Sequence, residues 1–204
     1  MKIVSTLEHY DSLAHEGHDP VYDPPLLRQY MSGWDGAAFF DVLDSGNKDV
    51  LEVGVGTGRV AIQVLQAGCR KLTGLDLSPK TINLAAANLR NHPNVELVSG
   101  DITDFLRPGA FDLAYSVLTF LHIADKAKAL SNIYHSLKPD GRFVLSASYG
   151  EEWLVYGERK LALYPLSVSD YIRLFETAGF RVESIQETER KLASIIVGMK
   201  KGSQ

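Results

Sequence analysis

Short apolar runs alternate with amphipathic stretches through the middle of the chain, from residue 49 to residue 147. Five runs have the length and composition of buried strands, near 50–53, 71–75, 95–98, 111–118 and 143–147. Between them, apolar positions recur at helical spacing over 57–67, 79–91 and about 125–137. Strands that alternate with helices predict a parallel α/β sheet, doubly wound, with helices on both faces.

The pattern changes after residue 166. Residues Ser167-Val-Ser-Asp170 precede a helix that is predicted to run through Ala178, with Gly179 ending it. Two further strands follow near 180–186 and 192–199, and the connection between them is too short for a parallel crossover. They must form an antiparallel hairpin, so the predicted sheet has seven strands with the last one antiparallel.

A glycine-rich turn joins the first strand of this core to its helix. Residues 49–58 read Asp-Val-Leu-Glu-Val-Gly-Val-Gly-Thr-Gly. Glycines at such a turn allow positive φ and leave space for a ligand at the helix N-terminus. A dinucleotide fingerprint, G-x-G-x-x-G, would place its third glycine at position 59, which is Arg59. The third glycine of this chain, Gly58, comes one residue early.

This spacing, with Glu52 two residues before the first glycine, resembles motif I of the class I methyltransferases that use S-adenosylmethionine. Further fragments of the chain resemble that family in order and spacing: Asp76 at the end of the second strand, Gly100-Asp101-Ile102, Phe111–Ser116 and Leu137–Arg142. The resemblance is close over about 48–147. It implies a Rossmann-like fold, S-adenosylmethionine as the cofactor and S-adenosylhomocysteine as the product.

The resemblance also implies roles for individual residues. An acidic residue at Asp76 accepts hydrogen bonds from the ribose hydroxyls, although a dinucleotide enzyme would use it in the same way. Asp101 approaches the adenine amino group, and Leu77 and Ile102 pack on the ring. The full cofactor site implied in this way is Glu52, Gly54, Gly56, Thr57, Gly58, Asp76, Leu77, Asp101, Ile102, Ser116, Val117 and Tyr22.

Two segments outside the core are expected to select the methyl acceptor. Residues 1–48 predict a helical cover that begins near Pro24, breaks around Gly33 and carries many aromatic residues. Residues 148–166 predict a hairpin with a polar tip, which could be a lid, a dimer contact or decoration, and a lid is favoured. The acceptor-site candidates are Tyr30, Trp153, Tyr156 and Tyr164.

Histidines raise two more questions. His122 follows the fourth strand, near the expected methyl group, and its unperturbed pKa would suit a general base. An ordinary histidine near the start of a helix is the favoured interpretation. His122 is nevertheless the one catalytic candidate that the sequence offers. His9, His15 and His18 could suggest a metal, but a solvated terminus is expected because no cysteine or carboxylate set stands at ligand spacing.

Composition narrows the class of protein. The chain has 204 residues, a formal net charge of −4 and one cysteine, Cys69. We expect one domain, 1–204, made of the cover (1–48), the core (49–147), the hairpin (148–166) and a C-terminal part (167–204). The absence of a basic cluster argues against nucleic acid as a partner. No apolar run reaches the ~20 residues that span a bilayer, so no membrane partner and a cytoplasmic location are expected.

Three functions are compatible with these residues. The first is transfer of a methyl group to a small-molecule acceptor by in-line displacement, in a protein that could be a homodimer. The second is a non-catalytic module that binds S-adenosylmethionine and another protein. The third is a nucleotide-dependent oxidoreductase, which Arg59 and the terminal hairpin disfavour. Family members that methylate exocyclic amines of bases carry Asn or Asp, Pro, Pro and an aromatic residue where this chain reads Tyr115-Ser116-Val117-Leu118. A small-molecule acceptor is therefore preferred.

Overall fold

A computed structural model describes residues 1–202 of the chain. Its centre is a seven-stranded sheet in the order β4-β3-β2-β5-β6-β10-β9. The strands are β2 (Asp49–Val53), β3 (Lys71–Asp76), β4 (Val95–Ser99), β5 (Phe111–Val117), β6 (Leu137–Ser148), β9 (Phe180–Glu187) and β10 (Ala193–Lys200). β10 runs antiparallel to both of its neighbours, β6 and β9, whereas the pairs from β4 to β6 are parallel. The predicted doubly wound sheet with a reversed last strand is confirmed.

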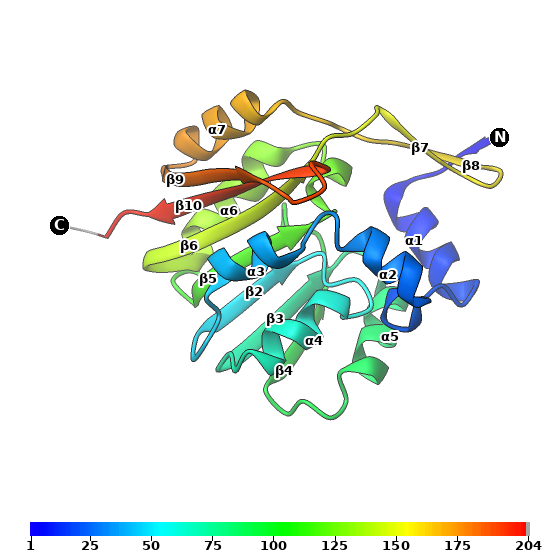
Figure 1. The fold of residues 1–204 in the computed structure, drawn as a ribbon, viewed down its shortest axis with the longest axis horizontal. Coiled ribbons are helices and arrows are strands. Elements are labelled where there is room, and N and C mark those ends of the chain that lie inside the picture. The colour runs from blue at the N-terminus through cyan, green and yellow to red at the C-terminus, as the bar shows by residue number, and fades with distance from the viewer. Residues whose placement is uncertain (203–204) are drawn as a thin grey trace.

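Helices cover both faces of this sheet (Figure 1). On one face lie α3 (Ala37–Leu43), α4 (Arg59–Gln66) and the end of α5 (Pro79–Asn88), whose apolar side chains form one core cluster with β2, β3 and β5. On the other face lie α6 (Lys126–Ser136) and α7 (Val168–Thr177), which form a second cluster with the same strands and with β6. Two buried layers therefore fix the sheet, as the near-continuous apolar strands require.

Local signals explain where several helices begin. Gly58 adopts φ 98° at the N-cap of α4, so the helix starts at Arg59 and the turn before it stays open. Ser78 caps α5 by accepting a hydrogen bond from Thr81 N, and Pro79 occupies the first turn. One boundary differs from the prediction. The strand predicted near 143–147 begins earlier, at Leu137, as part of β6, because Leu137 pairs with Phe111 at the start of β5.

The N-terminus and the 148–166 segment form one structure, which the sequence did not indicate. β7 (Trp153–Tyr156) and β8 (Arg159–Ala162) make an antiparallel hairpin, and β1 (Lys2–Ile3) adds to β8 as a parallel strand. Helix α1 (Thr6–His15) follows β1 and packs on α5 and β8. Figure 1 shows α1, β7 and β8 together at one end of the molecule. We call β1, α1, β7 and β8 the cover, in place of the whole of residues 1–48.

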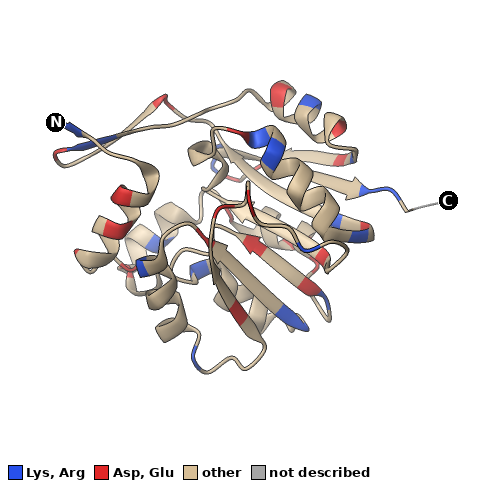
Figure 2. Cartoon of the chain, turned by 180° about the vertical axis from the view of Figure 1, so that it is seen from behind, with Lys and Arg blue, Asp and Glu red and all other residues tan. Residues whose placement is uncertain are grey.

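The remaining elements complete the chain's path. They are η1 (Pro20–Tyr22), α2 (Pro25–Met31) and η2 (Phe120–His122). Figure 2 shows acidic and basic residues interspersed over the elements visible from that side. Within residues 1–202, no helix has the length and apolar character needed to cross a membrane.

Candidate functional site

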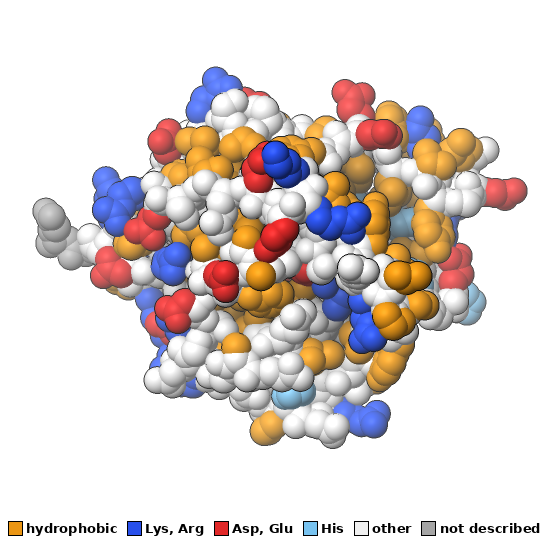
Figure 3. Space-filling view, viewed as in Figure 1, with side chains coloured by type: hydrophobic (Ala, Val, Ile, Leu, Met, Phe, Trp, Pro, Cys, Tyr) orange, Lys and Arg blue, Asp and Glu red, His pale blue; other side chains and the backbone are white. Residues whose placement is uncertain are grey.

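A hollow lies between the carboxyl ends of the strands and the cover. It has a volume of about 790 Å³ and is lined by residues that follow β2, β3, β4 and β5, together with residues of α1 and the hairpin. Figure 3 shows hydrophobic side chains gathered around a hollow at this end of the molecule. The volume is in the range of small-molecule and cofactor sites. We call it the main cavity.

Eight of the twelve residues predicted to hold a cofactor line this cavity: Gly54, Gly56, Thr57, Asp76, Leu77, Asp101, Ile102 and Val117. Four others lie elsewhere. Glu52, Gly58 and Ser116 are packed behind the turn, and Tyr22 is 75% exposed on η1. The structure thus brings together residues from four strand ends.

The glycine turn has the geometry that a close ligand contact requires. Gly54, Gly56 and Gly58 all adopt positive φ, and the amides of Gly54 and Val55 donate to the Leu75 carbonyl at 2.8 and 3.0 Å. A Cβ on Gly54 would overlap Thr119 Oγ1, whereas a Cβ on Gly56 would meet open space. The hydroxyl of Thr57 is buried and has no partner within the described residues. The turn therefore offers free space and an unpaired polar atom, which fit a polar ligand.

Asp76 joins this turn to the next strand. Its Oδ2 accepts from Gly56 N at 2.9 Å, and its Oδ1 accepts from Ser78 N at 3.0 Å. Burial raises the pKa of Asp76 above its ordinary value, and the hydrogen bonds from backbone amides oppose that shift. Each carboxylate oxygen keeps a lone pair beyond its amide bond. The carboxylate is therefore fixed in position with acceptor capacity on the cavity side.

A second acidic group stands where β4 ends. Asp101 Oδ1 accepts from Thr103 N and Thr103 Oγ1, at 2.8 and 2.9 Å, which leaves Oδ2 for another donor. Beside it, Ile102 is buried, and Leu77 is 37% exposed. Two aliphatic walls next to a carboxylate oxygen suit a flat apolar ring that carries an amino group.

Glu52 and Ser116 serve the scaffold below the turn. Glu52 Oε2 accepts from the Tyr115 hydroxyl at 2.7 Å, and Ser116 Oγ donates to the Val53 carbonyl at 2.8 Å. Burial raises the pKa of Glu52 to about 8. The folded protein therefore holds a proton on Glu52 at neutral pH that the unfolded chain releases.

This proton predicts a pH dependence of stability. Because the folded pKa of Glu52 is raised, its contribution is fully present below about pH 4.5 and is lost as pH rises through about 8. Glu52→Gln keeps the shape without the ionisation. We expect the stability of the variant relative to the natural protein to rise between pH 5 and 8, by at most about 1.4 kcal/mol per pH unit. Urea unfolding at several pH values measures this. Glu151→Gln, at an exposed site, should show no such trend, and parallel profiles for both variants would contradict the assignment.

A hydrogen-bonded pair of side chains also lines the main cavity. The Tyr10 hydroxyl lies 2.8 Å from His122 Nε2, and the two rings meet edge to face. Burial lowers the pKa of His122 to about 4 and raises the pKa of Tyr10. The imidazole is therefore neutral at pH 7 and can accept a proton. Its Nδ1 has no partner within the described residues.

The N-terminal histidines correct one prediction. His9 was expected in a solvated terminus, but it is 1% exposed and lines the main cavity. The reason is α1, which crosses the cavity and places His9 between the rings of Tyr10 and Tyr156. His18 is half-buried on the same wall, and His15 is exposed.

The acceptor-site candidates divide into three groups. Tyr156 and Tyr164 line the main cavity. Trp153 lines a neighbouring pocket and lies under the Lys160 ammonium, 4.0 Å from the ring centroid. Tyr30 is half-exposed outside both and packs against Trp34.

Tyr10 was not identified from the sequence as a residue of the site. Tyr10 lies on α1, and the available signal was the Ser5 N-cap followed by apolar positions at helical spacing. Leu118 adopts φ 57° directly after β5 and lines the main cavity. A bulky residue in this region of φ is uncommon and marks local strain at a site. Its place at the carboxyl end of a core strand puts Leu118 beside the crevice by topology, whereas the positive φ had no sequence signal.

Comparison with known proteins assigns the core. Residues 51–145 match the family described as "Methyltransferase domain". A relative from Methanocaldococcus jannaschii, whose description names protein N5-glutamine methylation, is 32% identical over 64% of this chain and 61% of its own length. The demethylmenaquinone methyltransferase of Deinococcus radiodurans is 30% identical over 62% of this chain and 55% of its own length. The chain thus spans little more than half the length of these relatives.

A solved structure extends the likeness to nearly the whole fold. Magnesium protoporphyrin IX methyltransferase from Synechocystis, crystallised with S-adenosylmethionine bound, superposes with a TM-score of 0.73. The alignment covers 96% of this chain and 95% of that one at 16% identity. At this identity the match concerns the fold alone.

Proposed function

Because the chain belongs to the class I S-adenosylmethionine-dependent methyltransferases, we propose that it binds this cofactor in the main cavity and transfers its methyl group to a small-molecule acceptor. One observation carries the proposal. The glycine turn and Asp76 share a single cavity with the hydrogen-bonded pair of Tyr10 and His122. When bound, S-adenosylmethionine supplies an electrophilic methyl group on a sulfonium, whose thioether is a neutral leaving group.

The residues of the strand ends would hold the cofactor. Asp76 accepts hydrogen bonds from the ribose hydroxyls with the oxygens that the turn has fixed. Leu77 and Ile102 pack on the adenine ring, and Asp101 accepts from its amino group. The open space at Gly56 and the unpaired Thr57 hydroxyl receive the amino-acid portion. Positioning of this kind supplies most of what an in-line displacement needs.

The cover would hold the acceptor. Tyr10, His122 and Tyr156 line the main cavity together with the residues of the strand ends. Neutral His122 accepts the proton of the acceptor directly or through Tyr10, as the acceptor atom becomes positively charged. The aromatic side chains also exclude water from the reacting atoms.

A small molecule fits this site better than a protein side chain. The relative from Methanocaldococcus jannaschii leaves a protein acceptor open. In this chain, however, residues of α1 and of the hairpin line the cavity beside His122. These elements leave less room for a protein loop than for a small molecule. A non-catalytic binding module would have no use for a base paired to a tyrosine.

The test of the function is transfer of a labelled methyl group. The purified protein is incubated with methyl-labelled S-adenosylmethionine and a panel of phenols, amines and carboxylic acids, and labelled product is separated from cofactor. Stoichiometric appearance of S-adenosylhomocysteine with a methylated acceptor supports the proposal. Binding of the cofactor without transfer to any acceptor would favour the non-catalytic module.

The pair of Tyr10 and His122 leads to a prediction for the rate. With an acceptor in hand, His122→Asn is expected to lower kcat by about 10²-fold, the order of a lost general base, with little change in the KM for the cofactor. Since the neutral form is present above about pH 4, the rate of the natural protein should show no His122 ionisation between pH 6 and 8. Tyr10→Phe should reproduce part of the loss. His15→Asn, at an exposed position, is the control. An unchanged kcat in His122→Asn would remove this residue from the reaction.

A further inference from the structure

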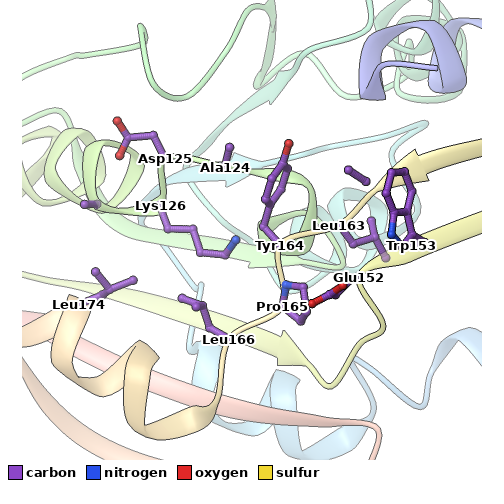
Figure 4. Close-up of a pocket in the computed structure, with 12 residues that line it drawn as sticks. Ala124, Asp125, Lys126, Glu152, Trp153, Leu163, Tyr164, Pro165, Leu166 and Leu174 are labelled. Carbon is purple, nitrogen blue, oxygen red and sulfur yellow. The ribbon is translucent and has the colours of Figure 1, made fainter. Parts of the chain in front are cut away.

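A second pocket adjoins the main cavity at the N-terminal end of α6. Its volume is about 650 Å³, and it lies between α6, the hairpin and α7 (Figure 4). Four residues line both spaces: Ala124, Asp125, Ala162 and Tyr164. Tyr164 therefore stands between the two spaces, and its backbone amide donates to the Leu121 carbonyl at 2.7 Å.

Lys126 is the unusual residue of this pocket. It is 4% exposed, and its Nζ donates to the Ile123 carbonyl at 2.6 Å. Nζ also lies 5.5 Å from the centroid of the Tyr164 ring, and Figure 4 shows it pointing towards Tyr164. Buried lysines are rare unless they are paired with an anion.

No carboxylate of the described residues compensates this charge. Burial lowers the pKa of Lys126 to about 8, and no acidic neighbour offsets that effect. Asp125 uses its carboxylate to cap α6 through Lys128 N at 2.9 Å. Glu152 is an exposed residue of the pocket lining. The ammonium therefore retains donor capacity that the fold does not use.

The walls around this ammonium are largely apolar. Trp153, Leu166 and Leu174 contribute side chains from the hairpin, from the segment before α7 and from α7 itself. The main cavity, in contrast, has no lysine or arginine among its described lining residues. An anionic group on a ligand that spans both spaces would therefore find its partner at Lys126.

We propose that the second pocket binds a carboxylate of the methyl acceptor at Lys126, while the apolar body of the acceptor passes Tyr164 towards His122. This inference rests on the proposed function and names its substrate class, an apolar carboxylic acid with a separate methyl-accepting group. A carboxylate at Lys126 receives charge-assisted hydrogen bonds and replaces the missing counter-ion. Lys126 itself is 4% exposed, and charge-assisted bonds at a buried group are stronger than the same bonds in bulk water.

Binding of 2-naphthoate tests the pocket without turnover. Its uncharged comparison ligand is 2-naphthylmethanol, which has the same ring system. Trp153 lines the pocket, so its fluorescence reports occupancy once Trp34, the other tryptophan, is replaced in a Trp34→Phe background. We expect 2-naphthoate to bind about tenfold or more tightly than the alcohol, as one charge-assisted hydrogen bond predicts. Equal affinities for the two ligands in the Trp34→Phe protein, which still carries Lys126, overturn the proposal.

Two variants locate the effect. Lys126→Met keeps the length of the side chain without its charge and should abolish the preference for 2-naphthoate. Lys128→Met, an exposed position on the same helix, should retain it. Circular dichroism, measured in parallel, reports that both variants are folded. A preference that survives in Lys126→Met overturns the assignment to Lys126.

The same titrations separate this inference from the proposed function. They are carried out with and without S-adenosylhomocysteine. In one outcome, the protein binds no S-adenosylhomocysteine but prefers 2-naphthoate to the alcohol in a way that depends on Lys126. This outcome overturns the proposed function and the role of the ligand as methyl acceptor. Cofactor binding together with equal affinities for the two naphthalene ligands overturns the carboxylate site and leaves the proposed function intact.

Discussion

Replacement of Gly54 by alanine is expected to abolish S-adenosylhomocysteine binding and to destabilise the fold by more than about 2 kcal/mol. Gly54 adopts φ 81°, where a Cβ costs roughly 1–2 kcal/mol in backbone strain. The new methyl group would also lie 2.6 Å from Thr119 Cγ2 and overlap Thr119 Oγ1. Either Thr119 moves into the main cavity or the turn opens, and both distort the cofactor site.

Gly68 provides the matched control for this variant. Its φ is 82°, but a Cβ at this position meets no atom within 4 Å. Gly68→Ala should therefore show only the backbone cost, roughly 1–2 kcal/mol, and normal S-adenosylhomocysteine binding. Denaturant unfolding and calorimetric titration of both variants make the comparison. Equal destabilisation and equal binding would show that the contact with Thr119 is not a constraint on this turn.

Asp76→Asn is expected to weaken S-adenosylhomocysteine binding by about 10–100-fold, which corresponds to hydrogen bonds to a charged group of roughly 1.5–3 kcal/mol. The amide nitrogen that replaces one oxygen cannot accept a hydrogen bond. One of the two bonds from Gly56 N and Ser78 N is therefore lost, and this loosens the contact between Asp76 and the residues around it. Calorimetric titration gives the two dissociation constants.

The control for charge is Asp104→Asn, because Asp104 is exposed beyond the second acidic turn. It removes the same charge from the protein and should leave the affinity unchanged. Circular dichroism of Asp76→Asn establishes that the sheet is retained. Normal affinity in a folded Asp76→Asn protein would place the ribose elsewhere.

The core of the fold could be predicted because its signals are local. Each parallel strand is an apolar run, and the short link between the last two strands excludes a crossover. Gly54 and Asp76 stand at strand ends, and parallel strands that start on one side must end on the other. Topology alone therefore brought the two residues to one cavity.

The cover could not be predicted in full because it depends on long-range pairing. β1 has only two residues, and it is a strand because Lys2 and Ile3 pair with Arg159 and Lys160. That pairing brings α1 across the strand ends and sets Tyr10 against His122. A sequence pattern shows the amphipathic character of α1. The surface against which α1 packs is formed by α5 and β8, which are distant in sequence, so the local pattern does not identify it.

Side-chain orientation explains the remaining differences. Glu52 lies next to the glycine turn in sequence, yet its carboxyl group accepts a hydrogen bond from Tyr115, its cross-strand partner on β5, and is buried. Ser116 likewise turns its hydroxyl to the Val53 carbonyl. Strand residues alternate between faces, so proximity in sequence to a site does not make a residue part of its wall.

The central claim is that the main cavity binds an adenosyl ligand of the methyl-transfer type. Calorimetric titration of the purified protein with S-adenosylhomocysteine, and in parallel with NAD, tests it most directly. The account predicts micromolar binding of S-adenosylhomocysteine with one site per chain and no detectable heat with NAD. Binding of NAD, or no binding of S-adenosylhomocysteine, would contradict it.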